Sequence, residues 1–237
     1  MLKYKDFQEI DQLQTTVFTP NFIFSTSEIL KKLMTLAPDG MLDGDPTVLP
    51  LPDDAPHEIP RITLENKEKT CRLEVAPARV NFFRNKFKEK EKVKPHEFVE
   101  SASQFLINLL DNIGANCGRI AAVINRFSYQ DDPSKEIASH FCKDNFMKEP
   151  FDRPSEFELH SLKKYEFLHS FKVNSWVRIR SGRIKSEKGL FRSVIFAQQD
   201  INTQAEESKT YNREEIQLFY KSVCDEFDSI LKIYFQK

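Results

Sequence analysis

The chain contains little glycine: six residues among 237, against 21 phenylalanines. Average proteins contain about 7% glycine. The six positions cannot form the G-x-G-x-x-G or G-x-x-x-x-G-K-[ST] phosphate-binding loops. The G-x-S-x-G signature of hydrolases and the H-E-x-x-H signature of zinc proteases are also missing. The common catalytic motifs are therefore excluded.

Closely spaced metal ligands are lacking as well. The cysteines, at positions 71, 117, 142 and 224, form no C-x-x-C pair, and the five histidines show no ligand spacing. A zinc site or a disulfide framework needs tighter spacing. We therefore expect four reduced thiols and no metal or cofactor.

Long apolar runs and an excess of one charge are absent too. No stretch approaches the roughly 18 apolar residues of a membrane-spanning helix. The first six residues carry charges where a signal peptide would become apolar. The 35 basic and 36 acidic residues give a formal net charge of -1, which argues against a globally cationic nucleic-acid binder. We expect a cytoplasmic protein that does not bind membranes.

The hydrophobic pattern predicts an α+β fold, an antiparallel sheet covered on one face by two long helices. Pro20 interrupts the first strand, which is typical of an edge strand or a bulge. Ser25 and Glu28 form a capping box for the helix that follows. The expected strands are residues 13–24, 61–66, 72–76, 79–83, 118–129, 156–167, 170–184 and 190–202. The expected long helices are residues 95–113 and 212–234, and shorter helices follow Ser25 and Asp132.

These elements give the same order, β-α-β-β-β-α, in residues 1–117 and in residues 118–237. The pattern favours a duplicated unit within one continuous domain. The alternative is an ordinary α+β domain whose two ends happen to match, because the halves share little residue identity.

Residues 38–60 have a composition of their own. They contain six of the twelve prolines, five Asp and one Glu, and no Lys or Arg. Such a stretch buries too little apolar surface to form a helix or sheet. We expect a long acidic loop that covers basic strands of the same chain or docks on a basic partner.

Basic residues gather in two segments. Residues 79–94 contain seven positive and two negative side chains, and residues 172–192 contain seven positive and one negative. Alternation along a strand places Trp176, Arg178 and Arg180 on one face, where we expect both arginines to be exposed. Basic and aromatic side chains together suit single-stranded nucleic acid, and the alternative is an ordinary solvated sheet face. We expect the basic residues after Arg180 to continue onto an adjoining turn, where Gly182 and Gly189 permit tight geometry. The candidate binding residues are Arg79, Phe83, Trp176, Arg178, Arg180, Arg183, Lys185 and Lys188.

One short pattern is compatible with a nuclease. Pro52-Asp53 is followed by Glu65-x-Lys67, which has the form of the PD…(D/E)xK motif. Two carboxylates would hold Mg²⁺ and the lysine would lie near the activated water. Asp53 lies in the proline-rich segment, which would not orient it rigidly.

The strand Gly118-Arg-Ile-Ala-Ala-Val-Ile-Asn-Arg-Phe127 and the later Asp200-Ile201-Asn202 resemble motifs of a sporadically distributed, functionally uncharacterised family of bacterial proteins of about this length. Asn202 stands where that family often has Asp. The resemblance implies a bacterial cytosolic protein and no particular activity. Asn125, Arg126, Asp200 and Asn202 end otherwise apolar strands, so we expect either an Arg126–Asp200 ion pair or a ligand site there.

The missing catalytic motifs, the aromatic content and the segregated charges favour a non-enzymatic interaction or scaffold protein. We expect it to work with a protein partner or as a homo-oligomer in a bacterial cytosolic assembly. The alternatives are a single-stranded nucleic-acid-binding module that uses residues 79–94 and 172–192, and a Mg²⁺-dependent nuclease.

Overall fold

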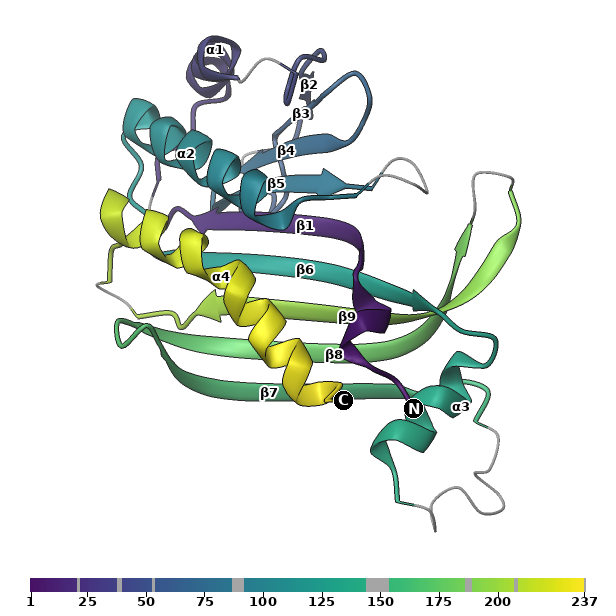
Figure 1. The fold of residues 1–237 in the computed structure, drawn as a ribbon. Helices are drawn as coiled ribbons and strands as arrows, with labels where there is room; N and C mark the ends of the chain where they lie inside the picture. Colours follow the sequence, from purple (N-terminus) through teal and green to yellow (C-terminus); the bar gives the residue numbers. More distant parts are fainter. Residues whose placement is uncertain are drawn as a thin grey trace.

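A computed structural model describes residues 1–20, 22–37, 40–52, 54–86, 92–143, 154–185, 189–206 and 209–236. The chain forms one nine-stranded antiparallel sheet with helices packed on it (Figure 1). The expected α+β class is therefore confirmed. None of the described helices is long and apolar enough to cross a membrane.

The strand order across the sheet is β2-β3-β4-β5-β1-β6-β9-β8-β7. Strands from residues 1–117 form one half of the sheet, strands from residues 118–237 form the other, and β1 pairs with β6 between them. In each half the first long strand also pairs with the last strand, β1 with β5 and β6 with β9. The strands are β1 (Glu9–Phe18), β2 (Thr47–Val48), β3 (Ile62–Glu65), β4 (Cys71–Ala76), β5 (Arg79–Asn85), β6 (Arg119–Tyr129), β7 (Glu158–Phe167), β8 (Phe171–Lys185) and β9 (Phe191–Thr203).

The two long helices, α2 (Pro95–Ile113) and α4 (Arg213–Tyr234), lie side by side on the same face of the sheet, as expected from their apolar stripes (Figure 1). The shorter α1 (Thr26–Leu36) packs beside α2. The 3-10 helix η1 (Tyr4–Phe7) and α3 (Pro133–Phe141) cover the far end of the same face.

Local signals fix where the helices begin and end. Asn212 and Glu215 form the expected capping box of α4, and the Asp132 side chain accepts a hydrogen bond from the Lys135 N–H at the start of α3. Helix α2 ends at Gly114, whose φ of 68° lies in the left-handed region that favours glycine. Ser25, in contrast, makes no capping hydrogen bond, so the predicted capping box is wrong.

Aromatic rings fill the core between the sheet and the long helices. The Phe82 ring of β5 meets the rings of Phe98 and Phe105 on α2 edge-on, at centroid distances of 5.5 and 5.6 Å. Phe227 of α4 is completely buried. Such rings bury a large apolar area, so this face holds the hydrophobic core of the sheet.

The first strand differs from the prediction. Strand β1 begins at Glu9 and ends at Phe18, before Pro20. It lies between β5 and β6 in the middle of the sheet, so the edge-strand interpretation of Pro20 is wrong. The proline lies beyond the last paired residue, where its missing N–H removes no ladder hydrogen bond.

The acidic segment of residues 38–60 is partly ordered against the sheet, contrary to prediction. Thr47 and Val48 form β2, which pairs with β3. The Gly44 N–H donates to the Glu65 carbonyl at 2.9 Å, and a Cβ on Gly44 would lie 2.5 Å from that oxygen. Main-chain hydrogen bonds hold this segment against β3, and composition alone does not predict such bonds.

Candidate functional site

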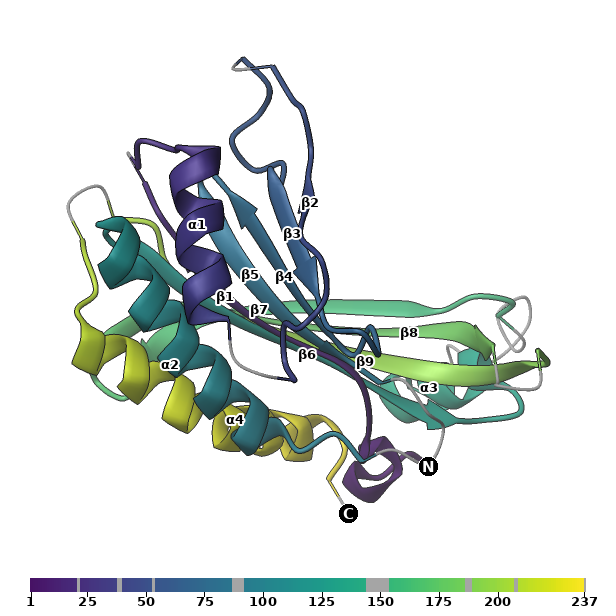
Figure 2. The same ribbon diagram turned by 90° about the horizontal axis from the view of Figure 1, so that it is seen from above.

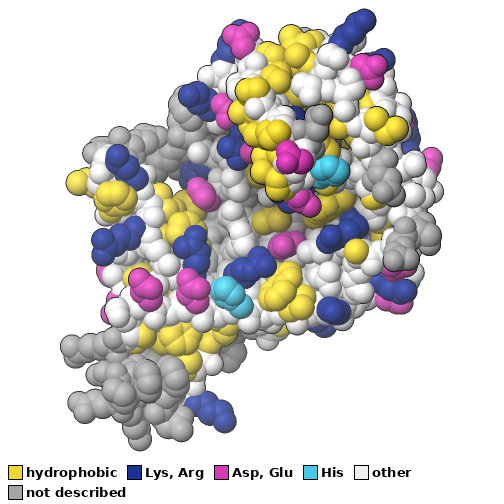
Figure 3. Space-filling model, turned by 180° about the vertical axis from the view of Figure 1, so that it is seen from behind, with side chains coloured by type: hydrophobic (Ala, Val, Ile, Leu, Met, Phe, Trp, Pro, Cys, Tyr) yellow, Lys and Arg dark blue, Asp and Glu magenta, His cyan; other side chains and the backbone are white. Residues whose placement is uncertain are grey.

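The face of the sheet opposite α2 and α4 is the candidate functional surface. We call it the open face, because none of the described helices covers it (Figures 1 and 2). Seen from above in Figure 2, the sheet bends so that β2–β5 and β7–β9 enclose an angle on this side. Figure 3 shows the resulting hollow, with the β8–β9 hairpin at its left. The open face is therefore concave.

A row of polar side chains crosses the centre of the open face. Asn85, Gln12, Asn125, Gln198 and Arg178 occupy directly opposite positions on β5, β1, β6, β9 and β8. We call these five residues the amide ladder. Each is half-buried.

Hydrogen bonds connect the whole amide ladder. Gln12 Nε2 donates to Asn85 Oδ1 at 2.8 Å, and Asn125 Nδ2 donates to Gln12 Oε1 at 3.3 Å. Gln198 Nε2 donates to Asn125 Oδ1 and Arg178 Nη1 donates to Gln198 Oε1, both at 2.9 Å. A side-chain amide has two N–H donors and two acceptor lone pairs, so these bonds leave hydrogen-bonding capacity toward the hollow.

Arginines stack on aromatic rings around the amide ladder. The guanidinium carbon lies between 3.6 and 4.9 Å from the ring centroid in five such pairs. Stacking holds a guanidinium in place while its edge can still donate hydrogen bonds. The pairs are Arg72–Phe83, Arg119–Phe18, Arg178–Trp176, Arg180–Phe196 and Arg192–Tyr129.

Asp200 is the acidic residue nearest the centre of the open face. Its carboxylate lies 3.9 Å from the Arg178 guanidinium and accepts a hydrogen bond from Asn202 Nδ2 at 2.9 Å. Burial nevertheless raises the pKa of Asp200 above its ordinary value, because desolvation outweighs these favourable contacts.

Five of the eight predicted binding residues lie on the open face: Arg79, Phe83, Trp176, Arg178 and Arg180. Their shared face confirms the strand alternation. Arg180 is exposed as expected. The Arg178 side chain is only 30% exposed, because it belongs to the amide ladder.

The remaining predicted binding residues lie elsewhere. Arg183 and Lys185 belong to the end of β8, not to a turn, and their alternation places them on the side opposite Arg180. Lys188 lies outside the described residues. Gly182 does not form a tight turn either: a Cβ there would lie 2.6 Å from the Phe196 ring, so this glycine makes room for Phe196.

The expected Arg126–Asp200 ion pair is wrong. Arg126 and Asp200 lie on opposite faces of the sheet, and Arg126 Nη2 instead donates to Asp228 Oδ1 of α4 at 2.6 Å. Neighbouring residues of a strand point to opposite faces, so Asn125 enters the amide ladder while Arg126 enters the core. Asn202, in contrast, lies beside Asp200 on the open face and accepts hydrogen bonds from Asn174 and Arg119.

The structure describes two residues of the nuclease pattern, Glu65 and Lys67. Glu65 ends β3, while the Lys67 ammonium pairs with Asp43 at 3.8 Å. Asp53 lies outside the described residues. In the part of the chain that the structure describes, no group of three or more His, Cys, Asp or Glu side chains could hold a metal ion.

The buried thiols are poor nucleophiles. Desolvation raises the pKa of both Cys117 and Cys224 to about 12, so neither forms appreciable thiolate at neutral pH. Cys71 is buried as well, and Cys142 is half-buried.

The sequence analysis missed three members of the amide ladder: Gln12, Asn85 and Gln198. A signal was present, because Gln12 and Gln14 alternate with apolar residues in the first strand and Gln198 lies two residues before Asp200. The pairing that aligns them across five strands depends on sheet order, which local pattern does not give.

Comparison of the chain with known protein families and with curated proteins finds no match.

Proposed function

We propose that the protein is a non-enzymatic interaction protein whose open face binds an extended segment of a protein partner. The amide ladder is the observation that carries this proposal. The row consists of half-buried amides on four strands and Arg178 on a fifth, and it is costly to desolvate unless a partner completes its hydrogen bonds.

The chemistry of the amide ladder matches a polypeptide. Peptide groups contain one donor and one acceptor, and the side-chain amides of Gln12, Asn125 and Gln198 offer both kinds of group. A phosphate backbone offers only acceptors and would leave the amide oxygens unused.

The Arg–aromatic pairs support the same function. Tryptophan, tyrosine and arginine are enriched among the residues that contribute most to protein–protein binding. Trp176 and Tyr129 lie on either side of the amide ladder, and an arginine stacks on each ring. The concave shape of the face would bury a partner's chain on more than one side.

Single-stranded nucleic acid is the second candidate ligand. The stacking of Arg178 on Trp176 and the exposure of Arg180 favour it, because bases stack on aromatic rings and phosphates pair with arginine. We rank it below a polypeptide, because a phosphate backbone supplies only acceptors to the amide ladder, whereas a peptide group supplies a donor and an acceptor.

We further propose a cytoplasmic location and a bacterial assembly as the setting, as the sequence resemblance implies. The matching strand order of the two sheet halves supports the proposal that residues 1–117 and 118–237 are a duplicated unit. Homo-oligomerisation stays a proposal beside a separate protein partner.

A random peptide library displayed on phage tests the function. We expect the wild-type protein to enrich peptides that no longer bind Val123→Arg, in which a long side chain blocks the centre of the open face between Gln14 and Asp200. The control is Leu218→Arg on the exposed side of α4, which should retain binding. Circular dichroism verifies that both variants fold.

The proposal is wrong if no peptide is enriched, or if the enriched peptides bind Val123→Arg as well as they bind the wild type. Fluorescence anisotropy with labelled dT12 tests the second candidate ligand, single-stranded nucleic acid. Binding of dT12 that is lost in Val123→Arg, together with no enriched peptide, would replace the polypeptide by single-stranded nucleic acid.

A further inference from the structure

Three arginines lie at one end of the open face. Arg61 directly precedes β3, Arg79 begins β5 and Arg119 begins β6. These three strands run in the same direction, with the antiparallel β4 and β1 between them, so all three arginines lie at the same end of the sheet. We call these residues the arginine row. Within the described residues, none of them forms an ion pair with a carboxylate.

Arg79 and Arg119 flank one aromatic side chain. Phe18 of β1 lies directly opposite Arg79 on one side and Arg119 on the other. The Arg119 guanidinium stacks on the Phe18 ring at 4.6 Å, and its Nε and Nη2 donate to Thr203 O and Asn202 Oδ1. Arg79 has no hydrogen bond or ion pair among the described residues, and its Nε is buried without a partner.

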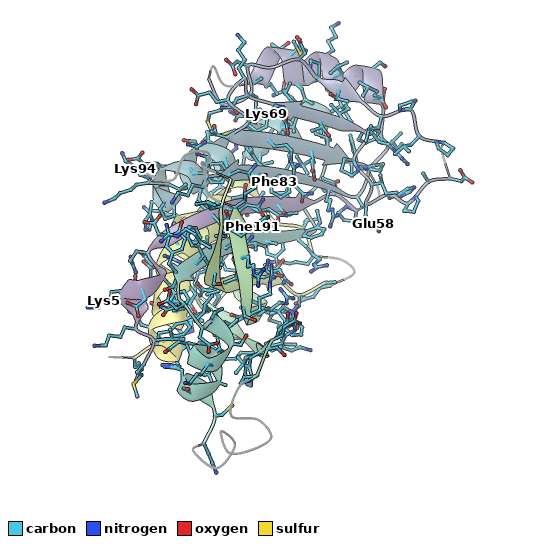
Figure 4. All side chains as sticks on the ribbon, turned by 90° about the vertical axis from the view of Figure 1, so that its right-hand side faces the viewer. Lys5, Glu58, Lys69, Phe83, Lys94 and Phe191 are labelled. Carbon is cyan, nitrogen blue, oxygen red and sulfur yellow. The ribbon has the colours of Figure 1, made fainter. Side chains whose placement is uncertain are left out.

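Arg61 is 7% exposed, which is unusual for an arginine without a carboxylate. Its Nη2 donates to Ala55 O at 3.0 Å, and its Nη1 is buried without a partner. Ala55 belongs to the segment of residues 54–60, which stands on the open-face side of the molecule, as the position of Glu58 shows (Figures 2 and 4).

Among the described residues of the acidic segment, no carboxylate forms an ion pair with these arginines. Residues 54–60 contact this end of the sheet through main-chain groups, Ala55 O to Arg61 and His57 O to the Ala78 N–H. Asp54 and Glu58 are exposed and form no ion pair with the arginine row. Arg61 is buried, Arg79 and Arg119 are half-buried, and an anion from outside the fold would offset the cost of removing their charges from water.

We propose that the arginine row binds carboxylates of an acidic segment of the protein partner. The proposal rests on the proposed function, because the same segment would lie along the amide ladder. Arginine binds carboxylates through paired N–H donors. A phosphate chain fits less well, because phosphates supply only acceptors and would leave the amide oxygens of the adjoining amide ladder unused.

Peptide binding measured by fluorescence anisotropy at 50 mM salt tests this specificity. The probes are labelled (Glu-Thr)6, its neutral counterpart (Gln-Thr)6 and dT12. We expect (Glu-Thr)6 to bind the wild type at least about tenfold more tightly than (Gln-Thr)6, and dT12 to bind more weakly than (Glu-Thr)6.

The arginine row is tested by Arg79→Gln together with Arg119→Gln. We expect this double variant to lose about tenfold or more of its affinity for (Glu-Thr)6 and little of its affinity for (Gln-Thr)6. The matched control, Lys135→Gln with Lys221→Gln, removes two exposed charges from α3 and α4 and should stay within about twofold of the wild type. Arg79→Lys with Arg119→Lys keeps the charge and should restore part of the affinity if the glutamine variant is unstable.

The proposal is overturned if (Glu-Thr)6 and (Gln-Thr)6 bind the wild type equally. It is also overturned if Arg79→Gln with Arg119→Gln loses no more affinity for (Glu-Thr)6 than the control Lys135→Gln with Lys221→Gln. Tighter binding of dT12 than of (Glu-Thr)6 would also overturn it in favour of phosphate. A different result would refute the proposed function itself: peptides of either charge would bind Val123→Arg as tightly as they bind the wild type.

Discussion

The two faces of the nine-stranded sheet use their polar groups in opposite ways. On the helix-covered face, the polar side chains are few and find partners within the fold, as Arg126 does with Asp228 and Tyr220 does with the Thr16 carbonyl. On the open face, polar side chains form a row across five strands and bond mainly to one another. One face is covered by the chain's own helices, and none of the described helices covers the other.

The difference in polarity between the two faces follows from the alternation of side chains along the strands of the sheet. Each strand contributes apolar residues to one face and polar or aromatic residues to the other. Two long helices are enough to cover one face, and none of the described elements remains to cover the second. The energetic consequence is that substitutions on the two faces should affect different properties, stability on one and binding on the other.

The largest expected effect is on the covered face. Phe227→Ala should lower the free energy of unfolding by about 3–5 kcal/mol, because the ring is fully buried and its loss leaves a cavity. Leu162→Ala on the open face should cost less than about 1 kcal/mol, because that side chain is 41% exposed. Urea denaturation of both variants measures the contrast. A loss below 1 kcal/mol for Phe227→Ala would mean that the helix stripe is not the core.

A smaller effect is expected within the amide ladder. Gln198→Ala should cost about 1–2 kcal/mol, because it leaves Asn125 Oδ1 and Arg178 Nη1 without their hydrogen bonds in a half-buried site. Gln217→Ala on the exposed surface of α4 is the matched control and should change stability by less than about 0.5 kcal/mol. Equal effects of the two substitutions in urea denaturation would show that the ladder is merely a solvated surface.

The smallest expected effect concerns Asp200 and depends on pH. Burial raises its pKa in the folded protein above the unfolded value, so the ionised carboxylate lowers stability at every pH above the folded pKa. Asp200→Asn should therefore raise the Tm at pH 7 to 8. This gain should shrink as the pH falls through the folded pKa and disappear below the unfolded pKa of about 3.9, where the wild-type carboxyl is protonated in both states. Thermal melts from pH 3 to 8 measure the difference. A variant that melts below the wild type at pH 7 would show that Arg178 and Asn202 outweigh desolvation.

The two ends of the open face also differ, and this contrast could not be expected from composition. The counted excess of positive charge in residues 172–192 pointed to Arg178 and Arg180. The structure gives Arg178 partners in Gln198 and Asp200, while Arg79 and Arg61 form no ion pair with an acidic side chain that the structure describes. The availability of a charge depends on its neighbours more than on how many charges surround it in the sequence.

The sequence by itself determined the helices, most of the strands and the residues that face the core. Apolar spacing of 3.6 gave α2 and α4, alternation gave β6 to β9, and Asn212 and Gly114 marked helix ends. These signals are local, since each depends on residues within a few turns or positions of one another. The errors were local as well: Pro20 lies beyond its strand, and Ser25 makes no cap.

Only the tertiary structure decided which strands are neighbours, and with that the candidate site. Asn85, Gln12, Asn125, Gln198 and Arg178 come from five strands, and Arg126 turned to Asp228 because α4 lies over its face. Strand order and register arise from the burial of one shared face by distant segments, a long-range effect that no window of sequence contains. Periodicity therefore revealed the elements, while their pairing created the amide ladder and the arginine row.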